Sequence, residues 1–154
     1  MVYPNGGDVY YGDWINGEKH GKGKYTVGFD GEIYQGDYVE GYRHGKGKLI
    51  YGNGDVYIGE FVKGKPHGKG IETYAQRGIY VPAGSRYDGY FFQGQRHTNN
   101  NQFGKLYWPP YESNYPDKSN IIGLRTFEGR WKNDKPVTPL IEVDDEFNGQ
   151  TEYS

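Results

Sequence analysis

The 154-residue sequence contains no cysteine, so neither a disulfide framework nor a thiolate metal site is available to it. Its apolar runs are only a few residues long, so we expect no membrane-spanning helix. The first residues, 1–4, lack the charged and apolar regions of a signal peptide, so we expect a cytoplasmic protein. Hydrophobic residues make up only 34% of the chain. Its mean hydropathy of −0.97 would suit a disordered chain.

Glycine and tyrosine dominate what is present, with 26 and 17 residues, and aromatic residues reach 18%. So many aromatics argue against disorder, because disordered chains are poor in them. A helical bundle would lose about 1 kcal/mol at each helical glycine, and collagen would need glycine at every third position. The composition therefore favours a β-rich chain in which glycine has positional roles and aromatic side chains replace an aliphatic core.

Charge is unevenly spread along the chain. The net charge of −2 argues against a general nucleic-acid binder. Residues 77–136 carry nine basic and five acidic side chains, whereas residues 137–154 carry five acidic side chains and no basic one. A basic middle region is therefore followed by an acidic tail.

A repeated motif organises the chain. Its first half, Gly-acid-x-Tyr-x-Gly-acid-aromatic, starts at Gly7, Gly31 and Gly54, and each copy continues into His-Gly-Lys-Gly. The steps of 24 and 23 residues indicate a repeat architecture. We expect one repeat domain, residues 1–136, followed by the acidic tail. Residues 3–6 resemble the end of a unit, so the sequence starts either with a short cap or inside a longer array. A stretched fourth unit and a partial fifth complete the set, with units at about 7–30, 31–53, 54–76, 84–108 and 126–136.

Each unit is predicted to fold as a β-hairpin, because apolar and polar residues alternate on both sides of a glycine-containing turn. A turn centred on residues 17–18 would pair Gly12 with Gly23. The same register would place Asp13 opposite Lys22. Paired glycines leave a hole on one face, which we expect an aromatic side chain of the neighbouring unit to fill. The residues with this structural role are Gly12, Gly23, Gly36, Gly47, Gly59, Gly70, Tyr10, Trp14, Tyr34, Tyr38, Tyr57 and Phe61.

The repeated pattern resembles the MORN repeat (membrane occupation and recognition nexus), whose usual form is aromatic-x-Gly-x-aromatic, a turn, and His-Gly-x-Gly. Residues 10–23, 34–47 and 57–70 match this form closely. The resemblance is tight over residues 7–76 and loose over residues 87–136. It implies an all-β fold, an elongated single-layer twisted antiparallel sheet of stacked hairpins.

The members of this family have mixed functions. Some are scaffolds in cilia, basal complexes and division rings, others are membrane-junction tethers, and others are accessory segments of lipid kinases or a lysine methyltransferase. The resemblance therefore implies a binding role and not a reaction. We expect a non-catalytic scaffold or adaptor for protein–protein interaction in a cytoskeletal, ciliary or membrane-associated assembly. A phospholipid- or phosphoinositide-binding membrane tether and an accessory module of a larger enzyme remain alternatives.

A stripe of lysines on one face has two interpretations. It could bind anionic lipid headgroups, a role often assigned to this family. Alternatively, the acids predicted opposite these lysines form cross-strand pairs, which contribute roughly 0.2–1 kcal/mol each and cancel the positive field. We favour the pairing. The lysines are Lys22, Lys24, Lys46, Lys48 and Lys69.

Metal binding and catalysis have little support. Histidines recur in register, but two strand spacings hold them about 9–10 Å apart. Zinc needs ligand atoms about 2.0–2.1 Å from the ion. No serine lies in a nucleophile elbow, and no phosphate-binding loop is present. We therefore expect no metal, no cofactor and no enzymatic activity. The histidines are His20, His44, His67 and His97.

The basic C-terminal end is the predicted partner site, because aromatic and arginine side chains dominate interface hot spots. A long connection at residues 109–117 adds to this candidate, since long loops are often functional; the alternative is that the region only caps the array. We expect a helical or extended partner segment on the aromatic face. Exposed edge strands also invite homo-oligomers. Residues 140–144 form an edge strand, fold back or stay disordered. The candidate contact residues are Tyr90, Phe91, Arg96, Tyr107, Trp108, Arg130 and Trp131.

Overall fold

The computed structural model describes residues 7–76, 81–112, 121–122, 124–137 and 139–143. Every regular element in these residues is a β-strand, so the predicted all-β class is confirmed. The strands are β1 (Val9–Ile15), β2 (Glu18–Thr26), β3 (Ile33–Val39), β4 (Tyr42–Ile50), β5 (Val56–Val62), β6 (Lys65–Thr73), β7 (Arg86–Phe92), β8 (Gln95–Arg96), β9 (Gly104–Trp108), β10 (Tyr111–Glu112), β11 (Ile121–Ile122), β12 (Arg125–Gly129), β13 (Trp131–Lys132), β14 (Lys135–Pro136) and β15 (Ile141–Val143).

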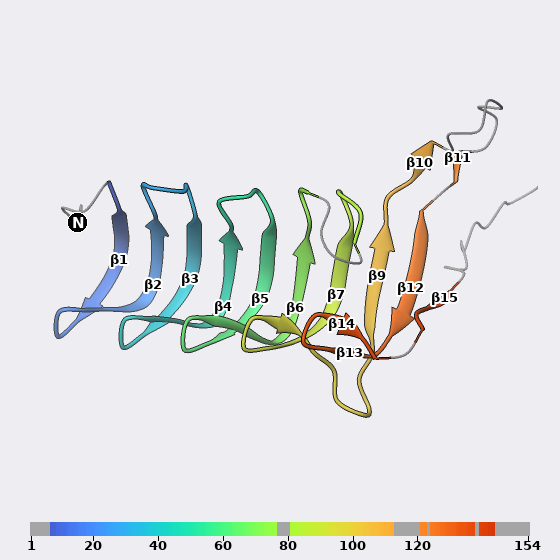
Figure 1. Cartoon of the computed structure of the whole chain (residues 1–154). Coiled ribbons are helices and arrows are strands. Elements are labelled where there is room, and N and C mark those ends of the chain that lie inside the picture. The colour runs from blue at the N-terminus through green and yellow to red at the C-terminus, as the bar shows by residue number, and fades with distance from the viewer. Residues whose placement is uncertain (1–6, 77–80, 113–120, 123, 138, 144–154) are drawn as a thin grey trace, which may run out of the picture.

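One long antiparallel sheet carries the fold. It contains 11 strands in the order β1-β2-β3-β4-β5-β6-β7-β9-β12-β15, with β8 paired to β7 outside this path. Successive hairpins lie side by side along the sheet, as the colour gradient of Figure 1 shows. The strand pairs β10–β11 and β13–β14 form two small separate sheets. The described chain is therefore the elongated stack of hairpins that the sequence predicts.

The hairpin turns lie one position earlier than predicted. Asn16 and Gly17 form the first turn, with φ values of 51° and 81°. Two consecutive positive φ values are typical of the type I′ turn that joins hairpin strands. The prediction of a turn at residues 17–18 is wrong, because it assumed two strands without an irregularity. Equivalent pairs with positive φ are Glu40-Gly41, Lys63-Gly64 and Gln93-Gly94.

Each of the first three hairpins contains a β-bulge in its second strand. In the first unit Gly12 faces Gly23, as predicted, whereas Trp14 faces Lys19. Residues 20–22 of β2 therefore lie opposite a single residue of β1. The same irregularity follows the paired glycines of the second and third units. A bulge bends its strand and increases the local twist, so the hairpins curl next to their glycines.

The acidic residue after the first glycine of each pair caps this bulge. The carboxylate of Asp13 accepts a hydrogen bond from the backbone N–H of Lys22 at 3.1 Å. The prediction that Asp13 and Lys22 face one another as a cross-strand pair is wrong, because the bulge removes the lysine from register. Equivalent backbone bonds join Lys46 to Asp37 and Lys69 to Glu60.

The paired glycines make room for the tyrosine of their own hairpin. A Cβ atom on Gly36 would lie 2.6 Å from the hydroxyl oxygen of Tyr34 and 2.5 Å from the Cα atom of Gly47. The Tyr34 hydroxyl donates to the backbone carbonyl of Asp37 at 2.9 Å, which holds the ring along its own strand. The first and third units repeat this bond. The prediction that an aromatic side chain of the neighbouring unit fills the hole is therefore wrong.

Neighbouring units interlock through a second aromatic residue, four positions after each tyrosine. Tyr38 packs edge-on against Tyr10 of the preceding unit, with ring centroids 5.3 Å apart. Pairs of this geometry contribute about 0.5–1.5 kcal/mol beyond the burial of their area. Except for Trp14, these rings are at most 4% exposed. This aromatic ladder consists of Tyr10, Trp14, Tyr34, Tyr38, Tyr57, Phe61, Tyr87, Phe91 and Trp131.

The fourth and fifth units keep the ladder and change the second strand. In the fourth unit β7 pairs with β8 near the turn and with β9 beyond it. Residues 97–103 leave the sheet between these strands as the long loop at the bottom of Figure 1. In the fifth unit β12 pairs with β15, which lies in the acidic segment. The sheet therefore continues past residue 136.

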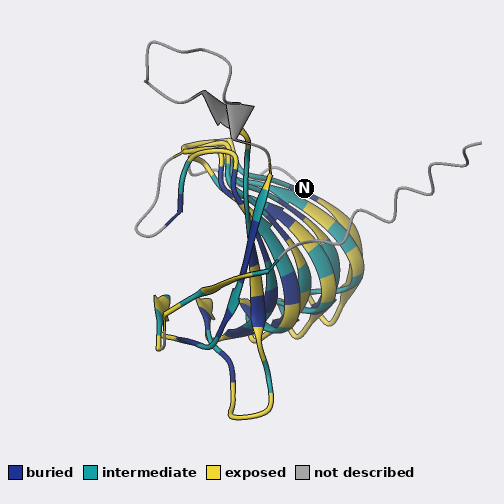
Figure 2. Ribbon diagram, turned by 90° about the vertical axis from the view of Figure 1, so that its right-hand side faces the viewer, coloured by how far each residue is buried: buried dark blue, intermediate teal, exposed yellow. Residues whose placement is uncertain are grey.

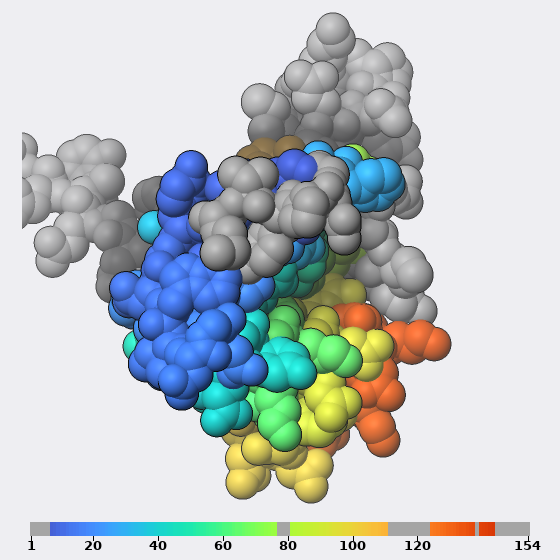
Figure 3. Space-filling model, turned by 90° about the vertical axis from the view of Figure 1, so that its left-hand side faces the viewer, coloured from blue at the N-terminus to red at the C-terminus, as the bar shows by residue number. Residues whose placement is uncertain are grey.

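The sheet has two unlike faces. The aromatic ladder occupies one of them, the aromatic face, and the side chains at intervening strand positions occupy the other, the open face. Figure 2 shows the strands as nested arcs along which buried and exposed positions alternate. The N-terminal end of the array faces the viewer in Figure 3, where β1 is the outermost described strand. Trp14 is 37% exposed there, because no described unit precedes it.

Candidate partner-binding surface

A trough of about 750 Å³ crosses the middle of the open face. Its floor is the backbone of the paired glycines in the second and third units, and side chains on either side of these glycines form two walls. One wall contains Lys46, Glu60 and Lys69. The opposite wall contains Lys48, Ile58, Ile71 and Asp88. We call this feature the glycine trough.

An isoleucine pair lies at the centre of the trough. Ile58 on β5 faces Ile71 on β6 in the sheet register. Ile58 is 51% exposed, and Ile71 is half-buried. The equivalent pair of the second unit is Gln35 and Lys48, so the third unit replaces polar side chains by apolar ones at this point. A partner that covers the pair would gain the free energy of removing apolar area from water.

The lysines that line the trough form no ion pair among the described residues, although Lys46 faces Glu60 in the sheet register. Lys22, on the same face outside the trough, forms an ion pair across the unit boundary with Asp37. The hydrogen bond from the Lys22 side chain lowers the pKa of the Asp37 carboxyl. The acids of the trough have other contacts: Glu60 accepts the Lys69 backbone N–H at 2.7 Å, and Asp88 pairs with Arg86 at 3.1 Å. The exposed lysines that remain without an ion pair in the described chain are Lys24, Lys46, Lys48 and Lys69.

The residues predicted as partner contacts do not form one surface. Phe91, Arg96 and Trp131 are buried in the aromatic core. Trp108 belongs to the same face, half-buried, with its ring centroid 4.6 Å from that of Phe127. A partner could not reach the first three without opening the core.

Two other predicted contacts, Tyr90 and Tyr107, lie on the open face. Tyr90 faces Lys69 in the sheet register and is half-buried. Tyr107 is half-buried and lies under the guanidinium group of Arg86, 5.2 Å from the ring centroid. Arg130 is half-buried next to the ladder residue Trp131. The trough was not predicted from the sequence. Its signal was visible in the aligned repeats, where Ile58 and Ile71 stand in place of the polar residues of the second unit.

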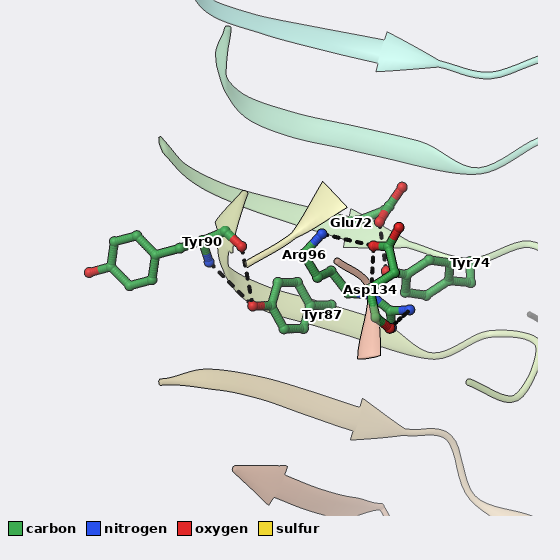
Figure 4. A network of polar contacts seen from close by, with 6 residues as sticks. All are labelled: Glu72, Tyr74, Tyr87, Tyr90, Arg96 and Asp134. Atoms are coloured by element: carbon green, nitrogen blue, oxygen red, sulfur yellow. Dashed lines mark hydrogen bonds and ion pairs between the residues drawn. The ribbon is translucent and has the colours of Figure 1, made fainter. Parts of the chain in front are cut away.

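A buried arginine joins the third, fourth and fifth units on the aromatic face. Figure 4 shows Arg96 facing Asp134, with Glu72 and Tyr74 beside them. The guanidinium carbon of Arg96 lies 4.4 Å from the ring centroid of Trp131. Its Nη2 donates to the carbonyl oxygen of Asp134 at 3.0 Å, and its backbone N–H donates to Oδ1 of Asp134 at 2.8 Å. These residues together form the Arg96 cluster.

Glu72 brings an acid into this cluster. The equivalent positions of the second and fourth units are Leu49 and Leu106, both buried in the core. The Tyr74 hydroxyl donates to the Glu72 carboxylate at 2.6 Å. Burial raises the pKa of Glu72, the Tyr74 hydrogen bond and the positive charge of Arg96 oppose this rise, and burial also raises the pKa of Tyr74. The cluster therefore joins neighbouring units to each other.

Replacing Glu72 by glutamine is expected to flatten the pH dependence of stability. The pKa of Glu72 is higher in the folded than in the unfolded protein, so folding favours its protonated form. This contribution is complete below the unfolded value of about 4.3 and is lost as pH rises through the raised folded value. Glutamine stays neutral and retains an acceptor for Tyr74. Urea unfolding between pH 4.5 and 7.5 should show a smaller loss of unfolding free energy for Glu72→Gln than for the wild type.

Glu142→Gln supplies a control of opposite sign. Arg125 donates two hydrogen bonds of 2.6 Å to Glu142. These bonds are the main reason why the pKa of the Glu142 carboxyl is lowered. That contribution is present above the unfolded pKa and is lost as pH falls. The control variant should therefore lose stability at neutral pH. If the unfolding free energy of Glu72→Gln depended on pH as steeply as that of the wild type, the proposed burial of the Glu72 charge would be contradicted.

The family model described as MORN repeat matches five segments that together cover more than half of the chain, namely residues 10–26, 34–56, 57–79, 87–97 and 127–137. Each match begins at the first ring of a unit, and four of these rings are tyrosines of the aromatic ladder. No curated protein matches the chain.

The described residues were also searched for a metal site and for a membrane-spanning helix. Within them, no group of three or more histidine, cysteine or acidic side chains could hold a metal ion. That part of the chain also holds no helix with the length and apolar character needed to cross a membrane.

Proposed function

The chain belongs to the MORN-repeat family, and from this premise we propose that it is a non-catalytic adaptor whose glycine trough binds a partner protein. The observation that carries the proposal is the trough itself, an open hollow with an exposed apolar centre and lysines that form no ion pair among the described residues. The volume of the trough lies within the range of roughly 300–1,000 Å³ that is usual for pockets that bind small ligands. The interlocked ladder behind the trough holds its walls in place, which lowers the entropy cost of binding.

The scaffolding roles that the family resemblance implies favour an organising function. We propose that the protein serves in a cytoskeletal, ciliary or membrane-associated assembly of the cytoplasm. A role as accessory module of a larger enzyme is the alternative for which a longer native chain would be needed.

Replacing Ile58 by glutamate is expected to remove partner binding while leaving the fold intact. The new carboxylate would replace the apolar side chain at the centre of the trough and offset part of the positive charge of the lysines around it. Ile15→Glu is a matched control, because Ile15 is 52% exposed and Ile58 is 51% exposed, yet Ile15 lies beside a hairpin turn outside the trough. Pull-downs from native lysate, compared by quantitative mass spectrometry, should show proteins retained by the wild type and Ile15→Glu and lost with Ile58→Glu. Identical sets for all three proteins would contradict the trough as the binding site.

A second function, binding to an anionic membrane surface, has one observation in its favour. Lys24, Lys46, Lys48 and Lys69 share the open face without ion pairs among the described residues. A juxtaposed cluster of lysines contributes about 1 kcal/mol per charge at an anionic leaflet. Vesicle flotation at low salt tests this function, since electrostatic attraction is strongest there. Absence of flotation with phosphatidylserine vesicles would exclude it.

A further inference from the structure

The width of the glycine trough selects the conformation of its occupant. The two walls are formed by residues two positions apart on each strand, such as Ile58 and Glu60. Two residues of a strand span about 6.7 Å. An α-helix with its side chains is about 10–12 Å wide. The trough therefore fits an extended segment lying across the strands better than a helix.

The length of the trough sets the size of that segment. Its lining residues extend from β3 to β7. Adjacent strands lie about 4.7–4.9 Å apart, so this distance is about 19 Å. A polyproline II segment rises about 3.1 Å per residue. About six residues of partner chain would fill the trough.

The lysine spacing sets the sequence pattern. Lys46 and Lys69 stand on the same wall, on β4 and β6, two strands and hence about 9.6 Å apart. Polyproline II has three residues per turn, so side chains three positions apart point to the same side and lie about 9.3 Å apart. Carboxylates at positions i and i+3 would therefore meet the two lysines in turn.

The lysines of the trough outnumber its acids. Glu60 lies between Lys46 and Lys69 and keeps its negative charge, but its carboxylate is held against the sheet by the backbone N–H of Lys69. Asp88, at the β7 end, is paired with Arg86. The opposite wall adds Lys48 and the exposed Ile58, which would contact an apolar side chain between the two acids.

We propose that the glycine trough binds an acidic segment of a partner protein in an extended, polyproline II-like conformation, with carboxylates three residues apart and an apolar residue between them. This inference rests on the proposed function and names the class of its ligand. The recognition is direct: charge-assisted contacts to Lys46 and Lys69 fix the register, and contact with Ile58 covers the apolar centre.

Fluorescence anisotropy with labelled synthetic peptides tests the inference on the full chain. The probe is Gly-Pro-Glu-Pro-Ile-Glu-Pro-Gly, which has the two glutamates three positions apart. The comparison peptides have the glutamates two positions apart, lysines in place of both glutamates, or an alanine-rich helix with glutamates seven positions apart. We expect the first peptide to bind at least about tenfold more tightly than each of the others. Tighter binding of the lysine peptide or of the helix would overturn the inference.

Protein variants locate the binding. Lys46→Glu and Lys69→Glu should each weaken the first peptide about tenfold, because each creates a like-charge contact. Lys63→Glu is the matched control, since Lys63 is an exposed lysine at a hairpin turn outside the trough. An equal loss in the control, or flotation with phosphatidylserine vesicles without any peptide binding, would refute the peptide assignment. If Ile58→Glu still abolishes partner capture while no peptide binds, the proposed function stands and only this inference fails.

Discussion

Replacing Arg96 by alanine is expected to lower the free energy of unfolding by about 3 kcal/mol, the lower end of the range for breaking a buried ion pair. Arg96 is 5% exposed and, from the fourth unit, contacts Tyr74 of the third unit and Trp131 of the fifth. Its removal would take away a positive charge that stabilises the Glu72 carboxylate and would empty the space above the Trp131 ring. The lower end applies because Asp134 is half-exposed and would be rehydrated. Chemical unfolding followed by circular dichroism measures the change.

Arg43 provides the matched control for this variant. It occupies the equivalent register position of the second unit, lies 5.2 Å from the Tyr34 ring and pairs with Glu32 inside its own hairpin. Because it joins no other unit in these contacts, Arg43→Ala should cost only about 1–2 kcal/mol. Equal losses for the two variants would show that the Arg96 cluster does not hold the C-terminal units together.

Gly36→Ala is expected to destabilise the protein by about 3 kcal/mol, at the upper end of the usual cost of overpacking. The new methyl group would overlap the backbone of the facing strand, at the Cα atom of Gly47, as well as the Tyr34 hydroxyl. A side chain could rotate away, but a paired backbone in the middle of the sheet must shift as a whole. Thermal and urea unfolding would detect the loss.

The control separates this overlap from backbone strain. Gly41 has a φ of 80°, and a methyl group added to it would meet no atom within 4 Å among the described residues. Gly41→Ala should therefore cost only the penalty of a left-handed residue, about 1–2 kcal/mol. Adding Tyr34→Ala should rescue little of the Gly36→Ala loss, since the facing backbone remains. A Gly36→Ala loss no larger than that of Gly41→Ala would contradict the packing scheme.

The spacing of the repeated residues was enough to predict the sheet and the facing glycines. The glycines occupy the same positions in each repeat, so one hairpin register places them opposite each other in every unit. Gly12 opposite Gly23 is such a case. The bulge was not predicted, since alternation of side chains continues through it on the first strand. Its signal was the Asn16-Gly17 dipeptide, which favours a two-residue turn and leaves extra residues on the second strand.

The candidate site was harder to predict, because burial depends on how neighbouring units meet. Arg96 and Trp131 have the composition of an interface hot spot, but the same side chains close the ladder. The lysine stripe on one face was predicted from alternation. That Lys22 pairs with the acid of the following unit depends on the register between hairpins, which no repeat spacing specifies.

Because of the bulge, the number of residues in a repeat can change without changing the spacing of the strands along the sheet. In the fourth unit residues 97–103 emerge where the first units have three residues, and yet Gly89 still lies beside Gly104. Extra residues inserted at the bulge leave the sheet as a loop, while the spacing of the strands and the packing of the aromatic rings remain the same. Such an array can acquire a new loop in any one unit, at a fixed distance from the trough. The strand pairing and the ring contacts that hold the sheet together stay unchanged.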